Sequence, residues 1–269
     1  MVLLGASACG RLGFDAISAD DAGIDVDGAT ASDAAMALDS GVDPDLVVWL
    51  EFDGDPTAGV VDSMATLPDG SCAPQRCPNT VPGLFGNAAQ FDGVDDYLQF
   101  DSAATLDFGG TGEAFSVTLW YRATDLTPPL QQVLMAQSTD GGSVSYQLSF
   151  EPWQDGPELD LVWKVCETDC QSGQFAVAGD LASVQRWVFI AGVWDGTETR
   201  LYVDSTLIAS MPKTTITFDG FPFMVGADYE TGGSIEDTFN GLIDDLRIYR
   251  RALSVKEQQA LMARAAGSL

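Results

Sequence analysis

Histidine is absent from this sequence of 269 residues. The absence excludes a Ser-His-Asp triad, a Cys-His nucleophile pair, a His-ligated zinc and an imidazole general base. Any acid–base chemistry would therefore depend on Asp and Glu side chains.

Basic residues are scarce, with 12 Lys and Arg against 40 Asp and Glu and a formal net charge of −28. A field of this sign repels nucleic acid and anionic lipid head groups. We therefore expect no nucleic-acid partner. The same field attracts divalent cations, of which calcium is the cofactor we consider.

Long apolar runs are also missing, because no stretch approaches the roughly 20 residues of a membrane span. Residues 1–14 instead resemble a lipoprotein signal end, in which Ala6, Ser7 and Ala8 precede Cys9. In bacterial lipoproteins this cysteine is acylated. The resemblance implies lipidation at Cys9 and an exported protein, either on the cell envelope (outer membrane or surface) or secreted, with membrane contact only through the lipid. The alternative is a frayed apolar N-terminus.

The other four of the five cysteines form two local pairs, Cys72 with Cys77 and Cys166 with Cys170. In an exported protein such pairs predict short-loop disulfides. The alternative is that each pair is half of a zinc site.

Residues 15–45 contain no Lys, Arg or aromatic residue and consist mainly of Asp, Ala, Gly and Ser. Such a stretch buries too little apolar area to offset its ordering entropy. We expect a disordered linker here, followed by one folded domain at 46–264.

From Leu46 onward, short alternating apolar runs are separated by Gly, Asp, Asn and Pro. This pattern predicts an all-β fold with two antiparallel sheets in a sandwich. Ser143–Phe150 and Leu159–Val165 are predicted to form a hairpin, and Asp195-Gly196 to form a hairpin turn. A capping box of Ser254 and Glu257 predicts one short C-terminal helix, with Val255, Leu261 and Met262 on one flank.

Four stretches carry a family resemblance: Trp49–Asp53, Gly86–Tyr97, Trp187–Asp204 and Phe239–Ser254. Together they resemble the LamG-like jelly-roll family of the concanavalin A-like lectin/glucanase superfamily. The resemblance covers about Leu46 to Met262. It implies a jelly roll outside the cytoplasm that recognises glycans or protein surfaces without catalysis.

Two positions depart from that family. Val188-Phe189 stands where the family often has histidines. Ser205 stands where the family usually has the glycine of a Tyr-Val-Asp-Gly hairpin. Neither departure is expected to change the fold.

The resemblance also implies a structural calcium site at Asp244, which opens the last long strand. Asp53, Asp92, Asp95 and Asp96 are further candidate ligands on loops expected nearby. Calcium takes six to eight oxygen ligands, so a few carboxylates with carbonyls and waters suffice. The alternative is that these acids cap turns through bonds to the backbone.

A possible catalytic motif begins at Glu158 and continues with Asp160. Related glucanases carry Glu-x-Asp-x-x-Glu, but Trp163 stands here in place of the acid. Retaining hydrolysis needs two carboxyl groups about 5 Å apart. We therefore expect no enzyme, and a strand in which Leu159, Leu161 and Trp163 face the core.

Among the six tryptophans, Trp153 stands out because it lies in a turn-rich link rather than in a strand pattern. A flat aromatic ring suits the face of a sugar, so Trp153 is the candidate ligand-binding residue. We expect a non-catalytic binding or adhesion module, for a glycan or a protein surface, tethered to the cell envelope. The alternatives are a display domain without a small ligand and a glucanase-like hydrolase with a degenerate motif.

Overall fold

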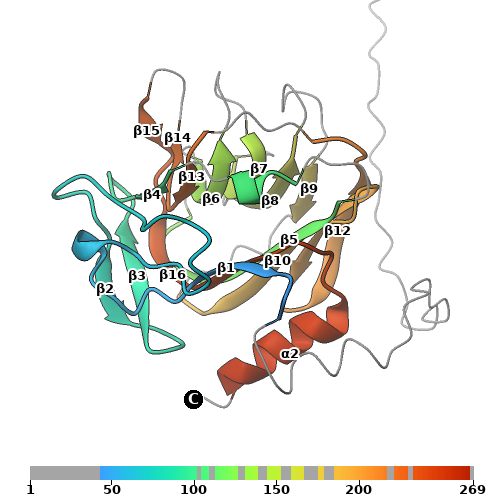
Figure 1. Ribbon diagram of the computed structural model, residues 1–269, viewed down its shortest axis with the longest axis horizontal. Helices are drawn as coiled ribbons and strands as arrows, with labels where there is room; N and C mark the ends of the chain where they lie inside the picture. The colour runs from blue at the N-terminus through green and yellow to red at the C-terminus, as the bar shows by residue number, and fades with distance from the viewer. Residues whose placement is uncertain are drawn as a thin grey trace, which may run out of the picture. The chain divides into compact units, whose positions relative to one another are not determined.

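The computed structural model (Figure 1) describes residues 43–101, 104–108, 113–126, 131–138, 144–152, 159–166, 175–178, 185–216, 221–229 and 233–266. Cys9, Trp153, Glu158 and Cys170 lie outside these ranges, as do residues 1–42. The predictions made for them therefore stay predictions.

Eight strands form the larger sheet, which is antiparallel throughout. They are β1 (Leu46–Leu50), β2 (Asn79–Pro82), β3 (Asn87–Asp92), β5 (Phe115–Ala123), β10 (Val188–Trp194), β11 (Glu198–Val203), β12 (Thr206–Pro212) and β16 (Asn240–Tyr249). Their order is β12-β11-β10-β5-β16-β3-β2, and β1 also pairs with β16.

Six strands form the second sheet: β4 (Leu98–Phe100), β6 (Gln132–Ser138), β7 (Val144–Glu151), β8 (Asp160–Val165), β9 (Phe175–Ala178) and β13 (Phe223–Val225). Their order is β4-β13-β6-β7-β8-β9. A small pair, β14 (Asp228–Tyr229) with β15 (Ile235–Glu236), and two 3-10 turns, Pro56–Ala58 and Ala104–Leu106, complete the described part outside the C-terminal helix.

The core lies between the two sheets, which face each other in Figure 1. Alternation decides which residues enter it: on β7, Tyr146, Leu148 and Phe150 are fully buried in the core. On β8, Leu161 and Trp163 are buried in the same core, and Leu159 joins them from just before the strand. The predicted antiparallel sandwich is confirmed, and so is the inward direction of these three residues.

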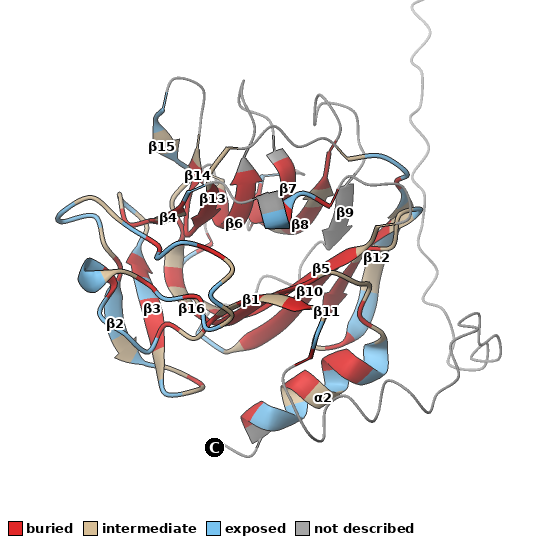
Figure 2. Cartoon of the chain, viewed as in Figure 1, coloured by how far each residue is buried: buried red, intermediate tan, exposed pale blue. Residues whose placement is uncertain are grey.

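The helix α2 (Val255–Ala266) packs on the face of the larger sheet opposite the core (Figure 1). Ser254 Oγ and N both donate to Glu257 Oε2, at 2.7 and 2.8 Å, so the predicted capping box is confirmed. Leu261 and Ala265 are buried against the sheet, and Figure 2 shows the opposite side of the helix exposed. Val255, the first residue of the helix, is 39 % exposed, and Met262 is partly buried, so the three residues predicted to share one flank differ in exposure.

Both predicted hairpins are present. β7 and β8 pair in antiparallel register, and Asp195–Thr197 joins β10 to β11 with Gly196 at a φ of 87°. Asp195 Oδ1 accepts from the backbone N–H groups of Thr197 and Glu198, both at 2.8 Å, which fixes that turn.

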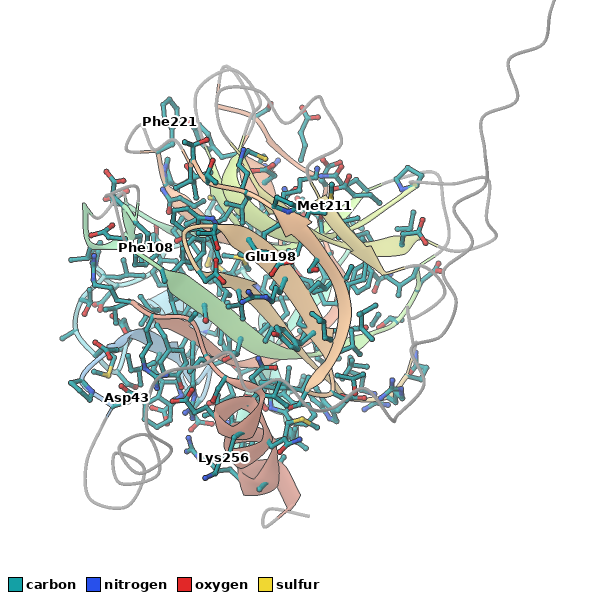
Figure 3. The ribbon with its side chains drawn as sticks, turned by 90° about the vertical axis from the view of Figure 1, so that its right-hand side faces the viewer. Asp43, Phe108, Glu198, Met211, Phe221 and Lys256 are labelled. Atoms are coloured by element: carbon teal, nitrogen blue, oxygen red, sulfur yellow. A yellow bond between two sulfur atoms is a disulfide. The ribbon has the colours of Figure 1, made fainter. Side chains whose placement is uncertain are left out.

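The fold already includes residues that the sequence placed at the end of the linker. Asp43 and Asp45 both pair with Arg251, at 2.5 and 3.5 Å, and Arg251 also pairs with Glu257 of α2 at 2.6 Å. Figure 3 shows Asp43 and Lys256 of α2 toward the same end of the molecule. The domain therefore includes Asp43 and Asp45.

The predicted disulfide between Cys72 and Cys77 is present. Cys166 is buried at the end of β8, and its predicted partner Cys170 lies outside the described residues. Within the described ranges, no helix has the length and apolar character needed to cross a bilayer.

Candidate functional site

An acidic pocket opens where β16 changes partners. The first half of β16, Asn240–Ile243, pairs with β3, and its last part, Leu246–Tyr249, pairs with β1. Between them, at Asp244 and Asp245, neither strand pairs with β16. A cavity of about 250 Å³ lies there, lined by Trp49, Glu51, Asp53, Phe85, Gly86, Asp244, Asp245 and Arg264.

Asp244 is fully buried in the wall of this pocket. Its Oδ2 accepts from the backbone N–H groups of Leu84 and Phe85, at 2.7 and 2.9 Å, in the loop that leads into β3. Its Oδ1 has no hydrogen-bond partner. Burial raises the pKa of Asp244 to about 7, against the opposing effect of the two N–H groups. A free carboxylate oxygen in such a place calls for a donor or a cation.

Asp245 forms a β-bulge beside it. The register of β16 against β5 shifts between Asp244 and Arg247, and Asp245 has a φ of 50°. Asp245 Oδ1 accepts from Trp49 Nε1 at 2.8 Å and from Arg247 Nε and Nη2 at 3.0 and 2.8 Å. The Arg247 guanidinium also lies 4.4 Å from the centre of the Trp49 ring. Asp245 and Arg247 therefore balance each other in charge.

The rest of the pocket wall carries net negative charge. Asp53 Oδ1 accepts from the Asn87 N–H at 2.7 Å, and Glu51 Oε2 accepts from Ser63 Oγ at 2.5 Å. Arg264 of α2 is the cation that lines the pocket, 5.5 Å from the Trp49 ring centre. With Asp245 matched by Arg247, three carboxylates face one guanidinium.

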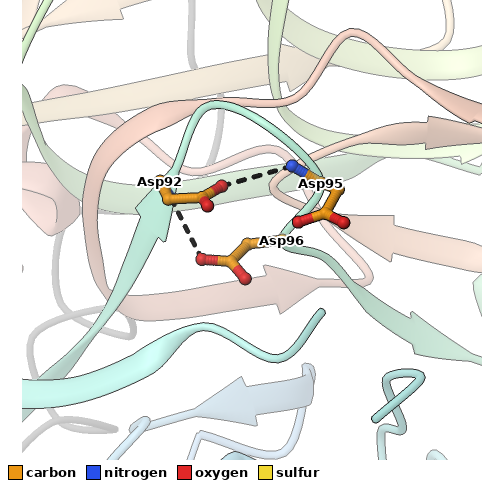
Figure 4. A group of neighbouring side chains, drawn as sticks. All are labelled: Asp92, Asp95 and Asp96. Atoms are coloured by element: carbon orange, nitrogen blue, oxygen red, sulfur yellow. Dashed lines mark hydrogen bonds between the residues drawn. The ribbon is translucent and has the colours of Figure 1, made fainter. Parts of the chain in front are cut away.

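The predicted metal ligands do not gather at one place. Asp244 and Asp53 line the acidic pocket, whereas Asp92, Asp95 and Asp96 form a separate group in the turn after β3 (Figure 4), with ligand atoms within 4.8 Å of one another. In the described part of the chain, this is the one group of three or more acids at that spacing. The pocket acids are more widely spread.

Hydrogen bonds account for much of the arrangement of the Asp92 turn. Asp92 Oδ1 accepts from the N–H groups of Val94 and Asp95, at 2.8 and 3.2 Å, and Asp96 Oδ2 accepts from the Asp92 N–H at 3.0 Å. Burial, and then the charges of Asp92 and Asp95, raise the pKa of Asp96 to about 6. Asp92 and Asp96 therefore cap their own turn, which is the alternative given above, and Asp95 pairs with Arg76 at 3.2 Å. The calcium assignment stays a prediction.

A row of polar side chains lies on the face of the smaller sheet that points away from the core. Gln147, Ser149 and Glu151 alternate with the core residues of β7, and Lys164 of β8 lies opposite Gln147. Lys164 Nζ lies 2.5 Å from Glu151 Oε1, which also accepts from Ser149 Oγ at 2.6 Å. Gln147 Nε2 donates to Asp228 Oδ2 at 2.9 Å. We call these five residues the polar row.

The polar row bears on the possible catalytic motif. Asp160, which belongs to the motif, lies directly opposite Glu151 in the β7–β8 ladder. The carboxyl group of Glu151 therefore lies beside the motif. Glu151 already contacts the Lys164 ammonium and accepts from the Ser149 hydroxyl. Glu158, the first residue of the motif, lies outside the described residues.

Sequence reasoning found Asp244 and Asp53 but missed Trp49, Glu51, Phe85, Asp245 and Arg264 as neighbours in one pocket. The Asp244-Asp245 pair inside a strand was the available signal, because strict alternation would put one of two adjacent acids into the core. Of the four tryptophans in strand patterns, Trp120 and Trp194 are buried, 7 and 2 % exposed, whereas Trp49 and Trp187 are only partly buried.

Comparisons with known proteins agree with this architecture. Domain 4 of AbnA, an extracellular GH43 arabinanase from Geobacillus stearothermophilus solved with arabinotriose, is 18% identical with a TM-score of 0.56, and the match covers 80% of this chain and 97% of that one. The binding domain of Paraclostridial Mosquitocidal Protein 1 is 16% identical with a TM-score of 0.60, over 81% of this chain and 51% of its own.

A third structure is the binding domain of Botulinum neurotoxin DC in complex with rat synaptotagmin II. It is 14% identical with a TM-score of 0.59, and the match covers 82% of this chain and 52% of that one. This chain therefore spans about half the length of the two toxin domains. No curated protein matches the sequence.

One family profile matches residues 92–257, which is more than half of the chain, and its description is the concanavalin A-like lectin/glucanases superfamily. The match includes β5, β16 and the start of α2, and it agrees with the two-sheet sandwich described above. The chain belongs to this superfamily.

Proposed function

We propose that the protein is a non-catalytic binding module that recognises a glycan or a protein surface outside the cytoplasm. The likeness to domains solved with arabinotriose and with synaptotagmin II supports binding as the general role of this fold. The ligands named are those of the two solved proteins, and neither is assigned to this chain.

The polar row is the observation that carries the proposal. Amide, hydroxyl, carboxylate and ammonium groups sit side by side in the row, and such groups orient a polar ligand in a binding site. Gln147, Ser149 and Glu151 are buried, whereas Lys164 is partly exposed, as is the neighbouring Asp160. We therefore place the ligand at the end of the row where Lys164 and Glu151 meet, beside Asp160. There Trp153, which follows β7 in the sequence, would supply an aromatic platform.

Binding of the full chain to a glycan array, with calcium and with chelator, tests this proposal. We expect saturable binding to one glycan class that Trp153→Ala and Asp160→Asn each weaken at least tenfold. Asp101→Asn is the matched control for charge, because Asp101 is exposed and lies outside the row. Equal binding by all variants would contradict the site.

The same experiment separates the alternatives. Release of reducing ends from a bound glycan, abolished by Glu151→Gln, would establish the glucanase-like hydrolase instead. No binding to any glycan or envelope protein would establish the display domain. Binding that requires calcium in the wild type and is lost in Asp244→Ala even with calcium present would support the structural calcium site.

The proposed cell-envelope location rests on Cys9. Metabolic labelling with a radioactive fatty acid should label the protein in its native host, and Cys9→Ser should abolish the label and release the protein from the membrane fraction. Equal fractionation of both forms would contradict the lipid anchor.

A further inference from the structure

The acidic pocket is larger than a site for a single ion, and its lining includes two aromatic residues. Its volume of about 250 Å³ compares with about 30 Å³ per water in the liquid. Two of its walls are aromatic, the indole of Trp49 and the ring of Phe85. A bare metal ion would leave these walls facing empty space or loosely held water. The shape and lining suit an organic ligand with an aliphatic part.

The charge of the pocket selects a cation. Glu51, Asp53 and Asp244 remain after Asp245 is matched by Arg247, and Arg264 alone opposes them. These acids are spread around the cavity, because the described residues hold no group of three acids within 4.8 Å other than Asp92, Asp95 and Asp96. A compact ion needs its ligands close together, whereas an elongated cation can reach carboxylates that stand apart.

Asp244 supplies the point of attachment. Its side chain is fully buried, its Oδ2 is held by the Leu84 and Phe85 N–H groups, and its Oδ1 has no partner. Leaving a buried acceptor unsatisfied is destabilising, and more so when the acceptor is charged. An ammonium group that donates to Oδ1 would remove this cost.

We propose that the acidic pocket binds a primary alkylammonium group on a short aliphatic chain, with the ammonium on Asp244 Oδ1 and the chain along Phe85 and Trp49. A second ammonium at the far end of a linear diamine would reach the carboxylate of Glu51 or Asp53. The same chemistry is offered by a free diamine and by a lysine side chain. This site is separate from the polar row, and its assay does not depend on the glycan.

Titration calorimetry of the full chain with 1,5-diaminopentane tests the proposal, at pH 8 and low ionic strength in phosphate buffer. We expect one saturable site in the wild type. Asp244→Asn keeps an oxygen for the Leu84 and Phe85 N–H groups but removes the charge, so we expect affinity to fall at least tenfold. Asp101→Asn makes the same charge change on an exposed residue and should bind as the wild type does.

Three further arms sharpen the result. Arg264→Gln removes the opposing cation and should raise affinity severalfold, an effect that a folding defect would not produce. 1,5-Pentanediol has the same chain without charge and should not bind. Nα-acetyl-lysine amide tests whether a lysine side chain suffices; binding by it and not by the diamine would assign the site to a protein partner.

Two outcomes would overturn the proposal. If Asp244→Asn and the wild type, both folded by melting curves, bind the diamine equally, the attraction is a general effect of the chain's net charge of −28. If calcium chloride gives an Asp244-dependent heat and the diamine gives none, the pocket is a metal site.

Discussion

Two consecutive residues in the turn between β11 and β12 have left-handed backbone conformations. Asp204 has a φ of 48° and Ser205 a φ of 60°, in the two-residue turn between Val203 and Thr206. A side chain in this region costs about 1–2 kcal/mol, which glycine avoids. The turn has no glycine. It adopts the left-handed geometry that suits an Asp-Gly hairpin turn, and the backbone at Ser205 is therefore strained.

Ser205→Gly should therefore raise the free energy of unfolding by about 0.5–1 kcal/mol, since the gain in backbone freedom of the unfolded chain offsets part of the relieved strain. Chemical denaturation measures this. Asp204→Gly is the matched control and should destabilise the fold. The Asp204 side chain accepts from the Phe189 N–H at 3.1 Å and pairs with Arg186 at 3.2 Å. Ser205 Oγ also donates to Met262 Sδ at 2.8 Å. A loss of stability in Ser205→Gly would mean that this contact outweighs the strain.

The pKa of Asp244 gives a second test at this scale. Its folded value, raised by burial to about 7, lies above the unfolded value of 3.8. The folded state therefore holds a proton that the unfolded state has lost, and this contribution is complete below about pH 4 and lost as pH rises through 7. Asp244→Asn cannot ionise. Relative to the wild type, its free energy of unfolding should rise by on the order of 2–4 kcal/mol between pH 4 and pH 8.

Urea denaturation at several pH values, in phosphate buffer without amines or divalent cations, gives that difference. Asp101→Asn should show no such trend. A constant difference between Asp244→Asn and the wild type would show that Asp244 stays ionised throughout.

At the scale of elements, the disulfide between Cys72 and Cys77 closes a short loop before β2. By loop-closure entropy such a loop is worth about 2 kcal/mol. The double variant Cys72→Ser with Cys77→Ser should lose about that much in chemical denaturation. Reduction of the wild type should cause that loss together with any loss from the predicted disulfide of Cys166, and reduction of the double variant should show the Cys166 contribution separately. An unchanged midpoint in the double variant would show that the loop is fixed by its other contacts.

Local patterns predicted elements well where the signal was local. The capping box fixed the start of α2, and alternation on β7 and β8 fixed which side chains enter the core. The acidic pocket could not be predicted this way. It depends on β16 leaving β3 and joining β1, which brings together residues nearly 200 positions apart such as Trp49 and Asp245. The β-bulge at Asp245 interrupts the alternation of side chains along β16, so the sequence shows no simple period there.

For the whole molecule, the boundary of the fold can be tested by truncation. A fragment of residues 43–269 should melt at the temperature of the full chain. A fragment of residues 46–269 loses the two acids that pair with Arg251, and also the hydrogen bond from the Arg250 N–H to the Asp45 carbonyl at 2.8 Å. We expect its melting temperature to fall by about 2–8 °C, for a loss of about 1–2 kcal/mol.

Limited proteolysis of the full chain should give the longer fragment. Equal melting temperatures of both fragments would place the N-terminal boundary of the domain at Leu46, where the alternating apolar pattern begins in the sequence. That pattern gives no indication of a charged contact made just before the first strand.

The Asp43–Arg251 contact has a mechanical consequence. If the protein is held by its N-terminal end while its ligand pulls elsewhere, the load enters the fold at Asp43 and passes at once to Arg251, and through Arg251 to Glu257 at the start of α2. Once the Asp43–Arg251 ion pair has broken, the force acts on β1. The hydrogen bonds between β1 and β16 then share a pull along the strand axis as a shear load. The ion pair would therefore break first, and the paired strands would resist the force together.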